Sequence, residues 1–172
     1  MSDIRPLTIA ISDEVVKDLK TRLDATRWPD QETVDDWTQG VPLDYQKSLM
    51  AYWASDYDHQ RLANRLNAYD NFVTEVNGLD IHFLHVRSSH ENARPLLLSH
   101  GWPGSIVEFL KVIGPLTEPQ DHGLDTDQAF HLVIPSLPGY GFSGKPTKTG
   151  WSVEKMAETF AMLMARLGYD HY

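Results

Sequence analysis

The chain has 172 residues, of which 41% are hydrophobic, and this is enough for one sizeable hydrophobic core. Its 15 Lys and Arg against 24 Asp and Glu give a formal net charge of −9, which disfavours nucleic acid and anionic membranes as partners. There is no cysteine, so disulfide bonds and thiolate metal sites are excluded. With no basic-then-apolar start and no stretch of membrane-spanning length, the sequence predicts a cytoplasmic protein without a membrane anchor.

The first 70 residues predict three helices. Ser12, followed by two acidic residues, is typical of a helix start, and Pro29 ends the segment that follows. Pro42 suits the first turn of a second helix, and Asp58 can cap a third. The second helix carries apolar side chains on one side: Tyr45, Leu49, Tyr52 and Trp53. We expect the three helices to bury several aromatic side chains and to form an arm that packs against a larger part of the protein. The alternative is an independent helical module.

A β-hairpin is predicted next, because Asn77-Gly78 separates two strand-like runs, 72–76 and 79–86. Strand alternation places His82 and His85 on opposite faces, so they do not converge on a metal ion. We expect both to be packing or surface histidines, and we expect no metal site.

The segment 95–105 is an apolar run that stops at His100 and a Gly/Pro-rich turn. Ser105 and Glu108 then form a capping-box pattern, with Phe109 and further apolar residues at helical spacing. The pattern therefore predicts a strand, a tight turn and a helix. Such a turn lies where ligands bind in open α/β sheets, but from pattern alone an ordinary connection without chemistry is equally favoured.

A polar loop is predicted over 117–128, then a buried strand over 130–135. The glycines at 139, 141 and 144 match a dinucleotide fingerprint, which we reject because no helix follows directly. We expect them to form a wide loop near a substrate cavity instead. Ser152 begins a last amphipathic helix, which Gly168 ends.

The turn His100-Gly-Trp-Pro-Gly-Ser105 resembles the oxyanion-hole turn of the α/β-hydrolase epoxide hydrolases. The flanking motifs are similar to those of the microsomal-type branch, which has its own N-terminal domain: 26–29, 37–43, 52–53, 77–79, 81–88 and 135–144. The resemblance runs from about Arg5 to Tyr169. At His59 the chain departs from it, since the family commonly has Trp-Arg there, followed by a glutamate.

The resemblance implies an α/β fold: an N-terminal helical arm followed by the first half of an α/β-hydrolase sheet, incomplete, with about four strands. It implies an epoxide hydrolase N-terminal domain over 4–112, with the arm extending to about residue 75, and a continuation of the hydrolase core over 113–172. The strand Leu96–Ser99 is expected beside the strand 130–135, with its outer edge unpaired. A central apolar strand exposed in this way predicts an edge-strand dimer or aggregation.

The reaction implied by the resemblance opens a small apolar epoxide with an aspartate, then hydrolyses the resulting ester to a vicinal diol, without a cofactor. The backbone N–H of Trp102 is the implied oxyanion donor, and His100, Gly101, Pro103 and Gly104 are expected to shape the turn. Trp102, Tyr140 and Phe142 are candidates for lining the substrate pocket. Trp102-Pro103 is a candidate cis peptide bond. We expect Trp102→Phe to be tolerated better than Pro103→Ala or Gly101→Val, because the chemistry uses the backbone.

The family's catalytic aspartate lies in a Gly-Gly-Asp-Trp-Gly elbow that this sequence does not contain, and no other nucleophile elbow is present. The sequence therefore predicts the N-terminal portion of an epoxide hydrolase that is inactive by itself. The alternative is a catalytically dead, shortened paralogue that acts as a binding or interaction module.

Overall fold

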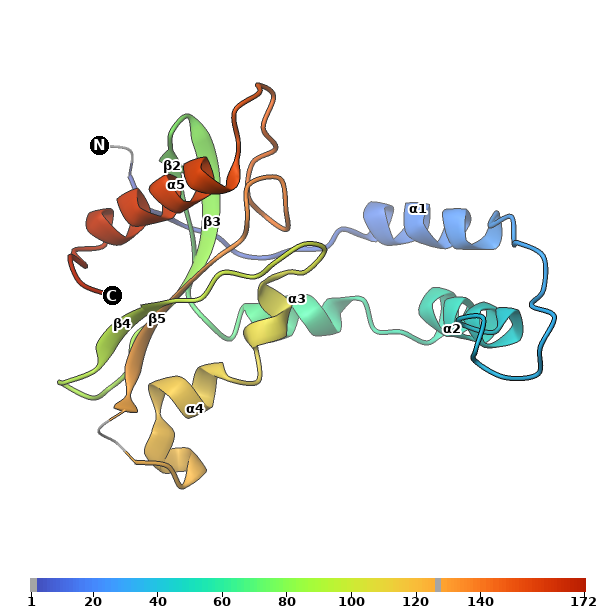
Figure 1. The fold of residues 1–172 in the computed structure, drawn as a ribbon, viewed down its shortest axis with the longest axis horizontal. Coiled ribbons are helices and arrows are strands. Elements are labelled where there is room, and N and C mark those ends of the chain that lie inside the picture. The colour runs from blue at the N-terminus through green and yellow to red at the C-terminus, as the bar shows by residue number, and fades with distance from the viewer. Residues whose placement is uncertain (1–2, 126–127) are drawn as a thin grey trace. The chain divides into compact units, whose positions relative to one another are not determined.

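The computed structural model describes residues 3–125 and 128–172 (Figure 1). Its contacts divide the chain into two compact units, one formed by residues 10–65 and the other by the N-terminal segment to Ile9 together with 66–172. Residues 126 and 127 of the predicted polar loop lie outside the described ranges.

The unit 10–65 is helical, as predicted, with α1 (Asp13–Asp24), α2 (Leu43–Ser55) and most of α3 (Gln60–Leu66). The hydroxyl of Ser12 accepts a hydrogen bond from the Val15 N–H, and Asp58 accepts one from the Gln60 N–H. Both predicted caps are therefore confirmed. The prediction that these helices bury their aromatics is wrong: the apolar side chains along α2, namely Tyr45, Leu49, Tyr52 and Trp53, are 38–52% exposed.

A cavity of about 430 Å³ lies beside α1 and α2, and its walls are largely apolar. It is lined by Ile11, Val15, Val16, Leu19, Trp53, Tyr57, His59 and Leu62. The Nε2 atom of His59 is buried there and has no hydrogen-bond partner among the described residues. His59 thus places a polar ring in a largely apolar surrounding.

The other unit is built on a five-stranded sheet with the order β1-β2-β3-β5-β4. The strands are β1 (Arg5–Pro6), β2 (Asn71–Val76), β3 (Leu79–Val86), β4 (Arg94–Leu97) and β5 (Phe130–Pro135). Only β4 and β5 pair in parallel; the other pairs are antiparallel. The two-residue β1 adds a fifth strand to the four that the sequence predicts.

The predicted hairpin is confirmed, since β2 and β3 pair across a turn in which Asn77 and Gly78 both have positive φ. The strand β4 lies beside β5 at one end of the sheet, also as predicted, but it covers 94–97 rather than 96–99. On one face of the sheet lies α5 (Val153–Arg166), capped by Ser152 (Figure 1). The core beneath it contains Val76, Ile81, Phe83, Val133, Phe160, Leu163 and Met164.

The helix predicted after Ser105 is replaced by three short pieces: the 3-10 helix η1 (Ile106–Phe109), α4 (Ile113–Thr117) and the 3-10 helix η2 (Pro119–His122). The reason is Pro115, which has no N–H to donate to Lys111 in a continuous helix. Because α4 starts at Ile113, Pro115 falls in its first turn, where no intrahelical donor is needed. The predicted polar loop is therefore partly helical.

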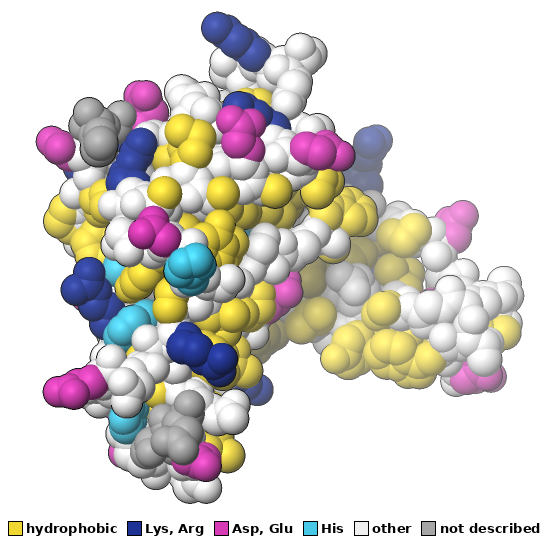
Figure 2. Space-filling model, turned by 60° about the vertical axis from the view of Figure 1, so that its left-hand side comes forward, with side chains coloured by type: hydrophobic (Ala, Val, Ile, Leu, Met, Phe, Trp, Pro, Cys, Tyr) yellow, Lys and Arg dark blue, Asp and Glu magenta, His cyan; other side chains and the backbone are white. Residues whose placement is uncertain are grey.

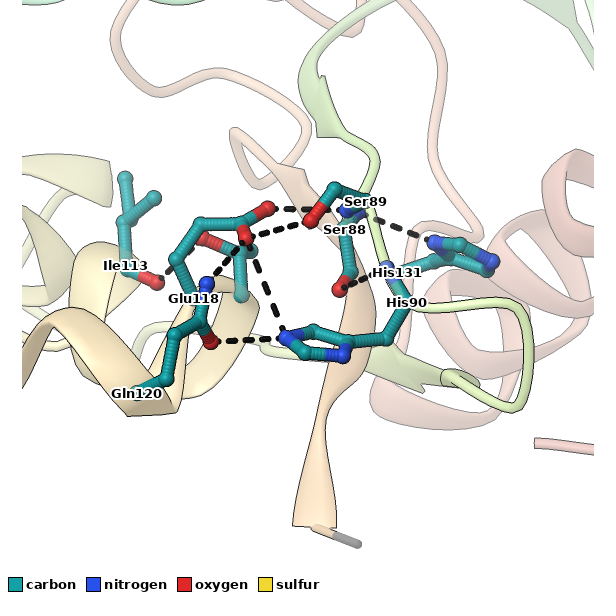
Figure 3. A network of polar contacts seen from close by, with 8 residues as sticks. Ser88, Ser89, His90, Ile113, Glu118, Gln120 and His131 are labelled. Atoms are coloured by element: carbon teal, nitrogen blue, oxygen red, sulfur yellow. Dashed lines mark hydrogen bonds and ion pairs between the residues drawn. The ribbon is translucent and has the colours of Figure 1, made fainter. Parts of the chain in front are cut away.

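Polar contacts join the segment after β3 to α4 and η2 (Figure 3). The Glu118 carboxylate accepts hydrogen bonds from the Ser89 N–H at 2.8 Å and the Ser89 hydroxyl at 2.6 Å. These bonds, with one from Gln120, lower the pKa of Glu118 to about 2. The network fixes the start of the connection that leads into β4.

Candidate active site

The turn 101–104 follows β4 and Ser99-His100, at the carboxyl end of that strand. It is closed by a hydrogen bond of 2.7 Å from the Gly104 N–H to the Gly101 carbonyl. The peptide bond between Trp102 and Pro103 is cis, which confirms the sequence prediction. The capping box that follows is also confirmed, since the Ser105 hydroxyl accepts from the Val107 N–H and the Ser105 N–H donates to Glu108.

The Trp102 N–H is a free donor on this turn. No acceptor for it occurs within residues 3–125 and 128–172. The indole of Trp102 is 81% exposed, so the side chain does not shield the amide by packing into the core. An unpaired backbone donor on a fixed turn is the element that stabilises a developing oxyanion.

The His100 ring forms hydrogen bonds to both the turn and the loop that follows β5. Its Nε2 accepts a hydrogen bond of 3.0 Å from the Leu137 N–H, so a neutral ring must carry its proton on Nδ1. That proton is donated to the Gly101 carbonyl at 3.0 Å. Both ring nitrogens of this buried histidine are thus occupied, and neither can act as a general base.

The turn borders a cavity of about 650 Å³ with largely apolar walls. The lining residues include Leu97, Trp102, Leu137, Tyr140, Met156, Phe160 and Tyr172. Of the three predicted pocket residues, Trp102 and Tyr140 therefore border this space. The structure does not bring Phe142 to it; the Phe142 ring lies edge-on to His82, with centroids 5.2 Å apart.

The glycine that the turn requires is Gly104 rather than Gly101. A Cβ on Gly104 would lie 1.7 Å from Glu108 Oε1 and 3.0 Å from the Gly101 carbonyl, whereas a Cβ on Gly101 would have nothing within 4 Å. Gly101 also lacks a positive φ. Of the two glycines expected to shape the turn, Gly104 is therefore the one whose lack of a side chain makes room for the folded-back Glu108 carboxylate.

Gly104→Ala is therefore expected to destabilise the chain by about 0.5–1.5 kcal/mol, because the added methyl group displaces the exposed Glu108 carboxylate and breaks its hydrogen bond with the Ser105 N–H. Gly101→Ala is the matched control and is expected to change stability by less than about 0.5 kcal/mol. Urea unfolding of both variants measures the difference. Equal losses of stability would contradict the geometry.

A buried polar network, which the sequence reasoning missed, lies on the other side of the Leu137 loop. His82 is fully buried, and its ring contacts Asn71 Oδ1 at 3.0 Å and the Ser136 hydroxyl at 2.9 Å. Burial lowers the pKa of His82 from its ordinary 6.5 to about 4. The only signal that the sequence offers for it is a pair of serines, Ser136 just before the glycine-rich loop and Ser143 within it.

His85, on the opposite face of β3, is also buried and contacts the Tyr169 hydroxyl at 2.9 Å. Burial, followed by the nearby charge of Arg87, lowers its pKa to about 4. The prediction that both histidines are packing residues is confirmed. No group of side chains suited to a metal ion occurs in the described part of the chain.

Stability is expected to fall as the pH drops from 6.5 to 4. In that window both histidines become protonated in the unfolded chain, where their pKa is near 6.5, but stay neutral in the folded chain, where they are buried. Proton binding therefore favours unfolding. The stabilising contribution is complete above pH 6.5, and the loss of stability reaches about 3 kcal/mol for each histidine by pH 4. Urea unfolding between pH 7 and 4.5 measures it, and a flat profile would contradict the assignment. Glu118 contributes only below pH 4.5, as the pH falls toward its pKa of about 2.

Charges of both signs are scattered among exposed hydrophobic side chains on the face shown in Figure 2. In the portion of the chain that the structure describes, no helix is both long and apolar enough to span a bilayer.

The family model described as epoxide hydrolase N terminus matches residues 4–109, and the model for the alpha/beta hydrolase fold matches 94–172. A protein of Stigmatella aurantiaca whose name places it among the epoxide hydrolases is 54% identical over 98% of this chain. Epoxide hydrolase 1 of Oryctolagus cuniculus is 39% identical over 98%. The chain spans about 38% of the length of each of these relatives.

Among solved structures, the juvenile hormone epoxide hydrolase of Bombyx mori superposes with a TM-score of 0.87 at 36% identity, covering 100% of this chain and 41% of the other. The epoxide hydrolase of Aspergillus niger gives a TM-score of 0.83 at 34% identity, covering 96% and 43%. The α/β fold and the sequence resemblance are both confirmed. The chain therefore belongs to the epoxide hydrolase family and corresponds to the part that carries the family's N-terminal domain and the turn at Trp102.

Proposed function

We propose that this chain is the N-terminal portion of an enzyme that hydrolyses small apolar epoxides to vicinal diols. Its part in the reaction is to supply one oxyanion donor and one wall of the substrate cavity. The single observation that carries the proposal is the free Trp102 N–H on a closed turn beside a largely apolar cavity of about 650 Å³.

The apolar walls favour an uncharged substrate, and the net charge of −9 does not repel one. In the complete enzyme the reaction has two halves. An aspartate attacks an epoxide carbon, the C–O bond breaks, and the alkoxide takes a proton; water then attacks the ester carbonyl to release the diol. The Trp102 N–H serves the second half, in which negative charge develops on the carbonyl oxygen of the ester.

A fusion protein tests the proposal. The complete 172-residue chain is joined to the part of the Stigmatella aurantiaca relative that follows the matched region, which is the natural choice at 54% identity. The fusion is expected to convert styrene oxide to its diol, while the same C-terminal part without this chain does not.

A folded, monodisperse fusion with no turnover would contradict the proposal and favour the alternative of a binding or interaction module. Replacing the elbow aspartate of the relative with asparagine is the negative control for contaminating hydrolases, because it removes the nucleophile without changing the contribution of this chain.

A further inference from the structure

The Gly101–Trp102 peptide group carries two features at its opposite ends. Its carbonyl accepts hydrogen bonds from the His100 Nδ1–H at 3.0 Å and from the Gly104 N–H at 2.7 Å. Its N–H is the free Trp102 donor. Because a peptide group is planar, fixing the direction of the carbonyl also fixes the direction of the N–H. His100 therefore controls where the Trp102 N–H points.

His100 is itself held by the peptide group between Ser136 and Leu137. The Leu137 N–H donates to His100 Nε2, and the Ser136 carbonyl at the other end of that group accepts from the Ser143 hydroxyl at 2.8 Å. Ser143 in turn accepts a hydrogen bond of 2.9 Å from the His82 N–H. This peptide group is thus anchored at both ends.

The ring of His82 supplies the third anchor, and its tautomer follows from its partners. The Asn71 amide donates to the carbonyls of Leu66 and Tyr69, both at 2.9 Å, which leaves its Oδ1 as the acceptor for His82 Nε2–H. Nδ1 of the neutral ring must then accept the proton of the Ser136 hydroxyl. The buried and neutral His82 thus orients the Ser136 hydroxyl, while His100 binds the N–H of the next residue, Leu137.

We propose that His82 and His100 form a relay across the Ser136–Leu137 peptide group and that both are positioning residues for the Trp102 N–H in ester hydrolysis. The relay runs from Asn71 on β2 through β3 and the end of β5 to the turn after β4. This inference rests on the proposed function for its catalytic meaning, but its geometry can be tested on the chain alone.

The first test is NMR spectroscopy of the 172-residue chain labelled with ¹⁵N. The ring shifts are expected to show His82 as the Nε2–H tautomer and His100 as the Nδ1–H tautomer. An Nε2–H proton on His100 would face the Leu137 N–H and would overturn the relay.

Substitution then tests whether the two histidines are coupled. His82→Phe is expected to shift both the Trp102 amide resonance and the ring resonances of His100. His85→Phe is the matched control, because it makes the same substitution at a buried histidine of the same strand whose partner, Tyr169, lies outside the relay. An unchanged Trp102 amide in folded His82→Phe would overturn the proposal. If His82→Phe does not fold, Ser136→Ala removes the same bond with a smaller change and is judged by the same criterion.

The second test uses the fusion protein described above. In His82→Phe the ester intermediate is expected to be hydrolysed about 10-fold to 100-fold more slowly, while ester formation changes by less than about twofold. His85→Phe is expected to leave both rates unchanged. Equal effects of the two substitutions, or an equal slowing of both half-reactions, would overturn the positioning role. An inactive fusion would contradict the proposed function, and the NMR experiments would still decide the relay.

Discussion

The purified 172-residue chain is expected to form no diol from styrene oxide above the uncatalysed rate. The cavity beside the turn offers one backbone donor but no Asp or Glu side chain, since neither residue type is in its lining. A lone oxyanion donor is worth about 10²–10³ in rate. That gain applies to hydrolysis of an ester intermediate. Without a nucleophile no ester forms, so the donor gives no measurable turnover.

Ser99 is the other nucleophile to consider, since it lines the cavity next to His100. A serine needs a base to remove its proton. His100 is the only histidine in the lining, and its two ring nitrogens are engaged by the Leu137 N–H and the Gly101 carbonyl. The geometry thus excludes a Ser-His pair as a substitute for the aspartate.

Product analysis by chromatography with the fusion protein as positive control measures this prediction. Diol formation that is proportional to protein concentration and lost on heating would contradict it. Ser99→Ala would then show whether the serine is responsible.

Local signals explain how much of the fold could be predicted. Ser12, Ser105 and Ser152 each precede a helix and each accept the expected hydrogen bond, and Asn77-Gly78 has the positive φ angles of a tight hairpin turn. These features depend on a few adjacent residues, so one sequence is enough to place them.

Features that depend on distant partners could not be placed in the same way. The exposure of Trp53 and its neighbours on α2 depends on which residues lie beside that helix. An apolar pattern predicts that one face of the helix packs, but it does not identify the residues that cover this face. The relay through His82 joins residues from four separate segments of the chain. Strand alternation gives the face on which His82 lies, but not its bonds to Asn71 and Ser136.

The isolated chain is expected to self-associate through the outer edge of β4. That strand pairs with β5 on one side, and no strand within residues 3–125 or 128–172 pairs with the other. The N–H groups of Arg94 and Leu98 point to β5, where they donate to Ala129 and Val133. By alternation, the positions whose N–H groups point outward are 95, 97 and 99.

The strand expected at Leu96–Ser99 is entirely without charge, and the structure corrects this. Because β4 begins at Arg94, the strand contains a charge and a proline, and Pro95 removes one of the outward donors. Leu97 and Ser99 keep theirs, next to the apolar cavity and to Val153, which is 79% exposed. The α5 residues Phe160, Leu163 and Met164 are buried, so the core beneath this helix is intact. We therefore expect a folded dimer rather than a loosely packed globule.

Sedimentation velocity over a range of concentrations measures the association. Ser99→Lys places a charge at the exposed outer edge, where pairing with a second copy would have to bury it, and is expected to shift the chain to monomer. Thr149→Lys adds the same charge at an exposed position outside the strands and is expected to leave the dimer intact. A wild-type chain that sediments as a monomer at all concentrations would show that this edge does not pair. Equal dissociation by both lysines would show that net charge, rather than the β4 edge, governs the association.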